Sequence, residues 1–361
     1  MIKALALIGD FNGCTHWRVE RPFVRLDEQG AYAAMADKDE PGVENVAHLF
    51  DAIVLPRMAW HNHEDGARFI GALHRAGLCV VYECDDDLFS EHINYRIQAT
   101  VEKSATIEEL EAKRVDRLAA IRLCDGVTVS SPRLATVMRE MVDCPVLVVP
   151  NAIDIPWWRD ALRAEPERTD RRVTIGWAGG SRPDDDIGPM AEAWGRVAQA
   201  YPDVRFAVYG YQPEPFRSAV PADRLVMYRW RPVESYPGPF RQIDIGCAAV
   251  TDTPFNRAKT PIKSWEYAMG GAAVVATPTL YGHCVTDQRT GLVAETADEW
   301  TAALSELIEN APRRKRLARN LLRHVEREHA LSANLWRWPT AWAAIRDQFL
   351  ARRGSGAIAR A

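Results

Sequence analysis

The sequence predicts an α/β protein made of two doubly wound domains, each a parallel sheet covered by helices. Short runs of β-branched and other apolar residues alternate with stretches of helical periodicity. This alternation starts again at Val173, after the polar and unpatterned stretch Ala161–Arg172. A length of 361 residues also favours two domains. We therefore expect a first domain over residues 1–165, a second over 166–330 and a separate last segment over 331–361.

The elements of the first domain follow from this pattern in chain order. Its strands are expected at Ala4–Ile8, Ala52–Leu55, Cys79–Glu83, Gly126–Val129 and Val146–Val149. Helical periodicity lies between them, for example at Asp65–Ala76 and Ile107–Arg122. Ligands bind at the carboxyl ends of the strands in such sheets, so we expect the site in a cleft between the two domains.

The second domain repeats the pattern. Its strands are expected at Val173–Trp177, Arg205–Tyr209, Leu225–Tyr228, Ile243–Ala248 and Ala273–Ala276. A helix is expected at Ile187–Ala200 and another at Pro312–His329. In the last segment, large apolar residues recur at the spacing of one helix face, at Trp338, Trp342, Ile345 and Phe349. We expect this helix to cross back and pack on the first domain.

Composition excludes several classes of protein. With 47% hydrophobic and 26% charged residues, the chain has an ordinary globular composition. No apolar run approaches the ~20 residues of a membrane span, so no integral membrane segment is expected. The first ten residues are typical of a buried strand rather than a signal peptide, which predicts a cytoplasmic protein. The seven cysteines are scattered and form no CxxC pair, so neither a disulfide framework nor a zinc cluster is expected.

The net charge of −4 hides an asymmetry along the chain. Residues 311–361 hold twelve Lys and Arg against three Asp and Glu. One interpretation is the solvated face of a helix. The other is a surface that docks on nucleic acid, on anionic lipid or on the acidic remainder of the chain.

The segment Asp252–Ala276 is the densest in polar motifs. Thr260 followed by Pro261 is typical of a helix start, with Thr as N-cap, and Gly270-Gly271 of a helix end. Lys259 and Lys263 lie near that helix N-terminus, where cations are unfavourable unless an anion binds. Glu266 follows one turn later and would accept hydrogen bonds from sugar hydroxyls. The alternative is an ordinary surface pair of Lys263 and Glu266.

A glycine-containing loop follows the first strand of the second domain, at Gly179, Gly180, Ser181 and Arg182. Glycines let a backbone approach a diphosphate, and Arg182 would clamp it. The alternative is a plain strand-to-helix turn with a surface arginine. Neither a full GxGxxG nor a GxxxxGK[ST] motif occurs, which disfavours dinucleotide and P-loop binding.

Acidic residues follow a strand of the first domain at Asp85 and Asp86. They are candidates for a catalytic base or for orienting an acceptor, and a helix N-terminus with acidic residues is the alternative. His16, in the loop after the first strand, is a further catalytic candidate. Asp184–Asp186 precede a helix and are expected to cap it. No bound metal is expected.

Taken together, these segments resemble GT-B glycosyltransferases, particularly the family 4-like (group 1) enzymes. The donor-site segment is matched by Lys259, Lys263, Glu266 and the strand Val274–Ala276. Other matching segments are His16–Phe23, Val148–Asp154, Ile175–Ser181, Ile243–Gly246 and Thr290–Val293. The resemblance covers most of the chain.

The resemblance implies two Rossmann-like domains and a nucleotide-sugar donor, with no other cofactor. The sugar would pass to a hydroxyl acceptor, with retention and without a metal. Glu266 matches the glutamate that binds the ribose. The family has a second glutamate eight residues earlier, where this chain has Ala258, so the usual donor-sugar contact is missing or supplied elsewhere.

Two alternatives stay open. One is a glycosyltransferase that modifies hydroxymethylated bases in DNA, with the basic last segment as its electrostatic contact. The other is a catalytically inactive module of the same fold that binds a nucleotide or a protein partner.

Overall fold

The structure, a computed structural model, describes residues 2–9, 13–31, 33–38, 47–58, 60, 62–90, 106–166, 168, 171–180 and 186–354. The chain divides into two compact units. Unit 1 comprises Met1–Ala152, Ala258–Thr260 and Leu331–Ala361, and unit 2 comprises Ile153–Arg257 and Pro261–Ala330.

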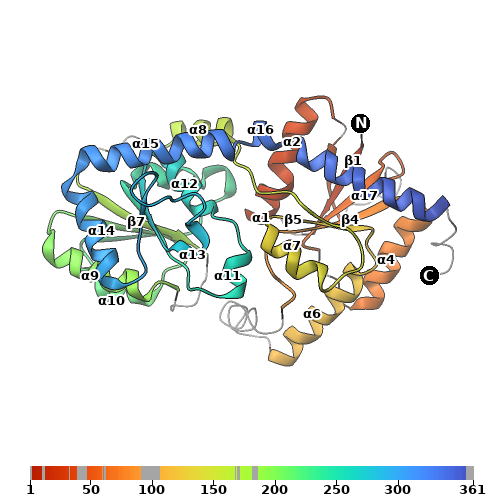
Figure 1. Cartoon of the computed structure of the whole chain (residues 1–361), viewed down its shortest axis with the longest axis horizontal. Coiled ribbons are helices and arrows are strands. Elements are labelled where there is room, and N and C mark those ends of the chain that lie inside the picture. The colour runs from red at the N-terminus through yellow and green to blue at the C-terminus, as the bar shows by residue number, and fades with distance from the viewer. Residues whose placement is uncertain are drawn as a thin grey trace. The chain divides into compact units, whose positions relative to one another are not determined.

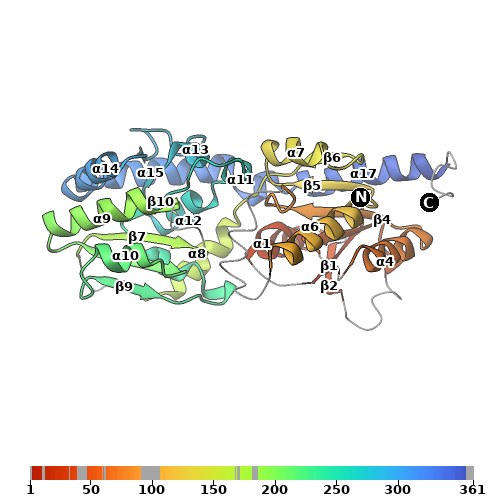
Figure 2. The same ribbon diagram turned by 90° about the horizontal axis from the view of Figure 1, so that it is seen from below.

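Unit 1 contains a parallel sheet of six strands in the order β2-β1-β3-β4-β5-β6. The strands are β1 (Ala4–Ile8), β2 (Ala33–Asp37), β3 (Ala52–Pro56), β4 (Cys79–Cys84), β5 (Gly126–Val129) and β6 (Val146–Val148). The central strands β3, β4 and β5 are buried along their whole length, as expected for a sheet covered on both faces. Strand β2 lies at the edge, beside β1 (Figure 2).

Helices cover both faces of this sheet (Figure 1). The short α1 (Gly13–Thr15) and the π-helical turn η1 (His16–Glu20) lead into α2 (Arg21–Glu28), on the same face as α16 (Leu331–Asn334) and α17 (Arg337–Gly354). On the other face are α4 (His63–Arg75), α6 (Ile107–Ile121) and α7 (Pro132–Arg139).

The last helix, α17, contributes the largest apolar side chains to one of the two cores of unit 1. Trp338, Trp342, Ile345 and Phe349 are all buried. The rings of Trp342 and Phe23 lie 5.0 Å apart. Since these side chains cover one face of the sheet and share its core, α17 is part of the fold of unit 1.

Unit 2 contains a second parallel sheet in the order β12-β11-β10-β7-β8-β9. Its strands are β7 (Thr174–Gly179), β8 (Arg205–Gly210), β9 (Leu225–Tyr228), β10 (Ile245–Ala248), β11 (Ala273–Ala276) and β12 (Leu292–Val293). The predicted fold class is therefore confirmed: both sheets are parallel and doubly wound.

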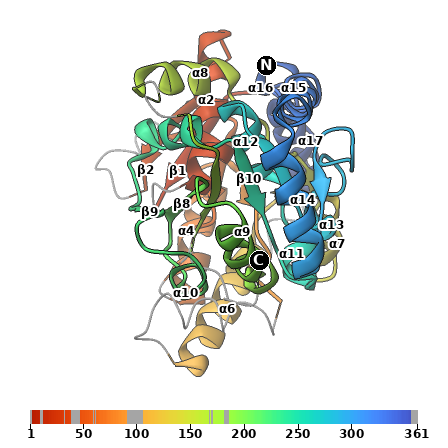
Figure 3. The ribbon, with the colours of Figure 1, turned by 90° about the vertical axis from the view of Figure 1, so that its left-hand side faces the viewer.

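The helices of unit 2 also form two layers, with α12 on one side of β10 and α9 on the other (Figure 3). The layer with α12 (Ile262–Gly270) includes α8 (Ile155–Ala164), α15 (Ala311–Glu328) and the short turns η3 (Val233–Ser235) and η4 (Gly238–Gln242). The layer with α9 (Gly188–Ala200) includes α10 (Glu214–Ala219) and α14 (Ala297–Glu309). Two short helices, α11 (Pro254–Ala258) and α13 (Pro278–Tyr281), follow β10 and β11.

Each sheet reverses its winding direction at one place. In unit 1 the reversal lies between β1 and β3, and in unit 2 between β7 and β10. The loops after these strands leave a crevice at the carboxyl ends, where ligands bind in open α/β sheets. Functional side chains are therefore expected at these two sheet edges.

Two details differ from the sequence-based expectation. The first segment of unit 1 ends at Ala152, whereas the sequence predicted a domain boundary at residue 165. The reason is that α8 packs on α12 and η4 and so belongs to unit 2. Thr260 is not the N-cap of α12. The N-cap residue is Pro261, and no side chain forms a capping hydrogen bond there. The Thr260 hydroxyl instead accepts a hydrogen bond from Asn151 in unit 1. None of the described helices has the length and apolar character needed to cross a membrane.

Candidate functional site

Helix α12 is fastened to the strands at the reversal point of unit 2. The Tyr267 hydroxyl accepts a hydrogen bond from the Ala178 amide of β7 at 2.8 Å and donates one to the Cys247 carbonyl of β10 at 3.1 Å. Gly246 makes this approach possible, because a Cβ there would lie 2.3 Å from the Tyr267 ring. The end of the helix is set by Gly271, whose φ of 83° suits glycine. Helix α12 is thus held firmly at this sheet edge.

A polar triad joins α12 to the turn between η3 and η4, with Glu266 buried and Lys263 and Tyr236 half-buried. Lys263 Nζ is 2.7 Å from Glu266 Oε2 and donates to the Tyr236 hydroxyl at 2.6 Å. Tyr236 in turn donates to Glu266 Oε2 at 3.0 Å. The Glu266 side chain is only 2% exposed, so this is not the surface pair considered from the sequence. Burial and the carboxylate of Glu266 raise the pKa of Tyr236 well above its usual value, which keeps the phenol protonated.

This triad leaves hydrogen-bonding capacity for a ligand. An ammonium group carries three N–H donors, and two of those of Lys263 are directed at Tyr236 and Glu266. A carboxylate accepts several hydrogen bonds, so Glu266 has room for hydroxyl donors. Tyr236 was not found from the sequence, since a loop tyrosine thirty residues from Glu266 gives no pattern that links the two.

Glycines and an aromatic side chain lie at the ends of β7 and β8. Gly179 ends β7 and its carbonyl accepts a hydrogen bond from the Tyr211 amide. Among the described residues, a Cβ on Gly180 would meet only the Trp230 ring, at 3.9 Å, and one on Gly210 would meet the same ring at 3.2 Å. The Trp230 side chain is 60% exposed. An exposed indole thus borders the glycine turn. The other two residues of the predicted loop, Ser181 and Arg182, lie outside the described residues.

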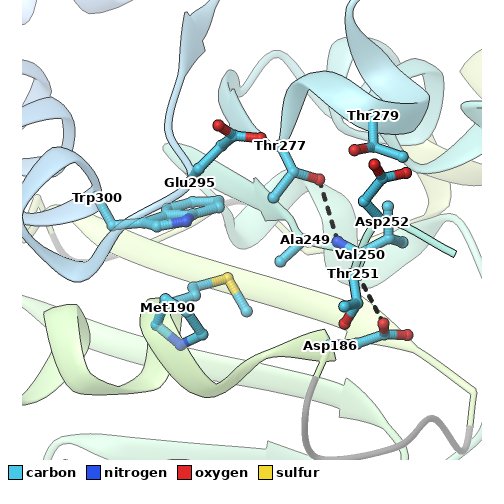
Figure 4. Close-up of a pocket in the computed structure, with 11 residues that line it drawn as sticks. Asp186, Met190, Ala249, Val250, Thr251, Asp252, Thr277, Thr279, Glu295 and Trp300 are labelled. Carbon is cyan, nitrogen blue, oxygen red and sulfur yellow. Dashed lines mark hydrogen bonds between the residues drawn. The ribbon is translucent and has the colours of Figure 1, made fainter.

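A cavity of about 170 Å³ opens at the same sheet edge, toward α9 and α14 (Figure 4). Its polar lining is acidic and hydroxylic, and Met190 and Trp300 supply apolar walls. Asp186 accepts hydrogen bonds from the Thr251 amide at 2.7 Å and from Asn256 Nδ2 at 3.1 Å. It therefore holds the loop after β10 and does not cap α9, whose N-cap is Ile187. Carboxylates and hydroxyls of this kind suit a polyhydroxylated or cationic group better than a phosphate.

In unit 1, a charged group gathers at the reversal point of the sheet. Arg57, directly after β3, directs Nη1 toward Cys14 Sγ at 2.6 Å, Asp85 Oδ1 at 3.2 Å and Asp86 Oδ2 at 3.5 Å. Its φ of 46° is unusual for a residue other than glycine, and its amide donates to the Glu83 carbonyl at 2.8 Å. Sequence reasoning missed Arg57, because a single arginine after a strand carries no motif.

Lys259 belongs to this group in unit 1. Its Nζ lies 3.9 Å from Asp86 Oδ1. Cys14, Asp85 and Asp86 bring ligand atoms within 4.8 Å of one another. The Arg57 guanidinium contacts all three, however, and burial together with Asp85 raises the pKa of the Cys14 thiol well above its usual value. A protonated thiol is a poor metal ligand, so the group suits recognition of hydroxyls better than binding of a metal.

The segment around His16 makes buried contacts that hold unit 1 together, which the sequence did not indicate. His16 is buried and pairs with Glu20 within η1. Arg18 is 2% exposed and forms an ion pair with the equally buried Glu83 at 2.8 Å. Burial raises the pKa of Glu83, and Arg18 opposes that shift. Arg18 also donates to the Val149 carbonyl at 2.6 Å, so it ties the loop after β6 to β4.

Part of the chain matches a known protein family, and its fold is similar to that of several solved structures. Residues 172–310 match the family described as glycosyl transferases group 1. HepE from Anabaena, solved with UDP-glucose, is 16% identical with a TM-score of 0.61, covering 95% of this chain and 100% of that chain. Sucrose-phosphate synthase from Thermosynechococcus elongatus is 14% identical with a TM-score of 0.63, over 97% of this chain and 100% of that chain. TarM from S. aureus is 9% identical with a TM-score of 0.57, over 81% of this chain and 55% of that chain. No curated protein matches the chain by sequence.

Proposed function

We propose that the chain is a glycosyltransferase that transfers a sugar from a nucleoside diphosphate sugar to an acceptor hydroxyl, since residues 172–310 match the group 1 family and the fold is similar to that of GT-B structures. The observation that carries the proposal is the polar triad of Lys263, Glu266 and Tyr236 at the reversal point of unit 2. It places the ammonium group of Lys263 and the carboxylate of Glu266, which can accept hydrogen bonds from hydroxyl groups, one helical turn apart.

Each part of a donor has a matching group in unit 2. Lys263 and the amides of the α12 N-terminus hold the diphosphate, together with Gly179, Gly180, Ser181 and Arg182. Glu266 accepts hydrogen bonds from the ribose hydroxyls. The exposed Trp230 ring beside Gly180 supplies a surface on which a base stacks. Stabilising the diphosphate leaving group is the main catalytic demand of the reaction, and these cations and helix amides meet it.

The polar group of unit 1 is assigned to the acceptor. Asp85 and Asp86 orient the acceptor hydroxyl, and Arg57 and Lys259 lie beside the two carboxylates as counter-ions. His16 stays a candidate for contact with the transferred sugar. The Arg57 contacts support a reaction without a bound metal. The likeness to the group 1 family supports retention of configuration, which the anomeric signals of the product in an NMR spectrum would establish. We place the enzyme in the cytoplasm, with the nucleotide sugar as co-substrate and no other cofactor.

The experiment that tests the donor site is a thermal-shift panel of nucleoside diphosphate sugars, with UDP-glucose among them. A ligand at about 100 times its Kd adds about 2.7 kcal/mol of apparent stability. Lys263→Ala should weaken binding of the nucleoside diphosphate by roughly 10- to 150-fold, because a charge-assisted hydrogen bond contributes about 1.5–3 kcal/mol. Binding of the bare nucleoside should change little. Lys315→Ala, an exposed lysine on α15 of the same unit, is the matched control.

Three outcomes would contradict the proposal. If no nucleotide sugar raises the melting temperature, the donor class is wrong. If Lys263→Ala weakens nucleoside and diphosphate equally, Lys263 does not bind phosphate. If a donor binds but is neither hydrolysed nor transferred with any acceptor, the chain is the inactive binding module considered from the sequence.

A further inference from the structure

Helix α15 carries a dense row of basic side chains on one side. Its apolar residues Leu317, Ala318, Leu321 and Val325 are buried on the other side. Lys315, Arg316, Arg319 and Arg323 are all exposed, and we refer to these four residues as the basic face. At 3.6 residues per turn they fall within an arc of roughly 100°, directed away from the buried side.

Within the described part of the chain, no carboxylate pairs with the basic face. The two acidic residues of α15 are used elsewhere, since Glu326 binds Arg159 and Glu328 binds Arg327. Asn320 Nδ2 donates to the Arg289 carbonyl at 2.9 Å, which brings the loop of the exposed Arg289 alongside the helix. A fifth cation is thereby added at the border of the basic face.

This concentration of charge does not serve the fold. Like charges spaced by four residues repel one another, as Lys315, Arg319 and Arg323 do here. The cavity described in unit 2 is not lined by residues of α15, so these cations do not belong to it. What remains is a fixed, exposed, positively charged surface that a negatively charged partner would cover.

We propose that the basic face docks on the anionic headgroups of a lipid surface and holds the protein there by electrostatic attraction. Five long, flexible side chains spread over an arc can all reach a flat lipid surface. A single strand of nucleic acid is narrow and would contact only some of them. The basic face contains no aromatic residue, and stacking on aromatic residues is how single-stranded nucleic acids are usually held. It also contains no large apolar residue, so the contact is with headgroups and not by insertion. This inference does not depend on the proposed reaction.

The test is sedimentation of the full chain with two kinds of vesicle. One contains phosphatidylcholine alone, and the other contains phosphatidylcholine and phosphatidylglycerol in equal parts. We expect binding to the second kind only, lost as salt rises, because exposed charges are screened. Each basic residue near an anionic surface is worth about a fivefold change in affinity. Replacing all four residues of the basic face by Gln should therefore lower affinity by roughly 100-fold or more.

A matched control removes the same number of charges elsewhere. The exposed arginines Arg68, Arg133, Arg163 and Arg217, two from each unit, are replaced by Gln and should leave vesicle binding nearly unchanged. If the fourfold variant of the basic face fails to fold, Arg319→Gln with Arg323→Gln should still lose roughly 25-fold.

Three results would overturn the proposal. The first is wild-type protein that ignores anionic vesicles. The second is equal loss of binding in the basic-face variant and in the control variant. The third is salt-sensitive binding to duplex DNA that the basic-face variant loses while vesicle binding is absent, which would assign the surface to nucleic acid.

Discussion

Arg57 serves as the shared counter-ion of Asp85 and Asp86, and its backbone conformation is part of that role. Burial alone would lower the pKa of Arg57, but Asp85, Cys14 and Asp86 raise it well above its usual range. The side chain therefore stays charged at any pH at which the protein folds. Since φ is positive at Arg57, the surrounding contacts hold a conformation that an isolated residue rarely adopts.

Arg57→Met should reveal this role as a pH-dependent loss of stability. Without the guanidinium, the carboxylates of Asp85 and Asp86 repel each other whenever both are ionised. The free energy of unfolding should fall by about 1–3 kcal/mol near pH 7. The loss should shrink as the pH drops toward 4, because protonation of one carboxyl relieves the repulsion.

Urea denaturation at both pH values measures this effect. Arg57→Lys keeps the charge and is the control. A deficit of Arg57→Met that is the same at pH 7 and pH 4 would mean that the arginine contributes packing and not charge.

Gly246→Ala should destabilise unit 2 by about 1–3 kcal/mol, the usual cost of overpacking. The new Cβ would meet the ring of Tyr267, which must then move and lose its hydrogen bonds to β7 and β10. Gly188→Ala is the matched control, since a Cβ there meets no described atom within 4 Å and the residue begins α9. Thermal denaturation of both variants measures the difference, and equal melting temperatures would show that Tyr267 does not fasten α12.

At the scale of elements, the hydrophobic pattern predicted ten of the twelve described strands and missed β2 and the two-residue β12. The strand expected at Gly126–Val129 has those bounds, because a β-branched run between turn residues is specific. Strand β2 reads Ala-Ala-Met-Ala-Asp and has no β-branched residue. It lies at the sheet edge and stays half-exposed, so pairing with β1, and not its own propensity, makes it a strand.

The candidate site was predicted in part for a related reason. Lys263 and Glu266 lie on one helix, so their spacing of three residues predicts that they meet. Tyr236 and Arg57 reach their partners from other loops and strands, and only the folded chain brings them there. Pairings across elements leave no period in a single sequence, which is why both residues were missed.

The end of α15 is expected to respond to acid through His329. This ring stacks on Trp265 of α12 with 4.2 Å between centroids, and burial lowers its pKa to about 4. His324 lies 5.3 Å away and its pKa is lowered by burial as well, whereas Glu328 acts in the opposite direction on both rings. The unfolded chain binds the proton more readily than the folded chain between about pH 4 and 6.5. Stability contributed by neutral His329 is thus complete above pH 6.5 and is lost as the pH falls toward 4.

His329→Phe should keep the aromatic stack and remove this titration. Its melting temperature should fall less than that of the wild-type chain between pH 6.5 and 4, while the two chains stay similar near pH 8. Calorimetry at the three pH values gives the comparison. If the melting temperatures of the two chains change equally with pH, protonation of His329 does not destabilise the folded state.

For the molecule as a whole, α17 should decide the stability of unit 1 but not of unit 2. Burial of Trp338, Trp342, Ile345 and Phe349 contributes about 1.5–3 kcal/mol each. Their sum is comparable to the whole stability of a domain, about 5–15 kcal/mol. A chain ending at Ala330 should therefore lose the unfolding transition of unit 1 in calorimetry and keep that of unit 2.

A milder change separates this effect from gross misfolding. Trp342→Ala should cost about 3–5 kcal/mol, as large-to-small changes of buried aromatic residues do. Trp336→Ala, at a tryptophan that is 57% exposed, should stay within about 0.5 kcal/mol of the wild-type protein. If the chain ending at Ala330 keeps its full melting profile, α17 is not required by unit 1.

The three-segment make-up of unit 1 has a consequence for its biosynthesis. Ribosomes release a chain from the N-terminus, so β1 to β6 emerge long before α17, and all of unit 2 emerges between them. Domains usually fold in the order of their synthesis. Here the first sheet must wait, with the apolar face that α17 will cover still open to water, until unit 2 has been translated. That interval makes the nascent chain a client for chaperones that bind exposed apolar surface, and pauses in translation within unit 2 would lengthen the exposure.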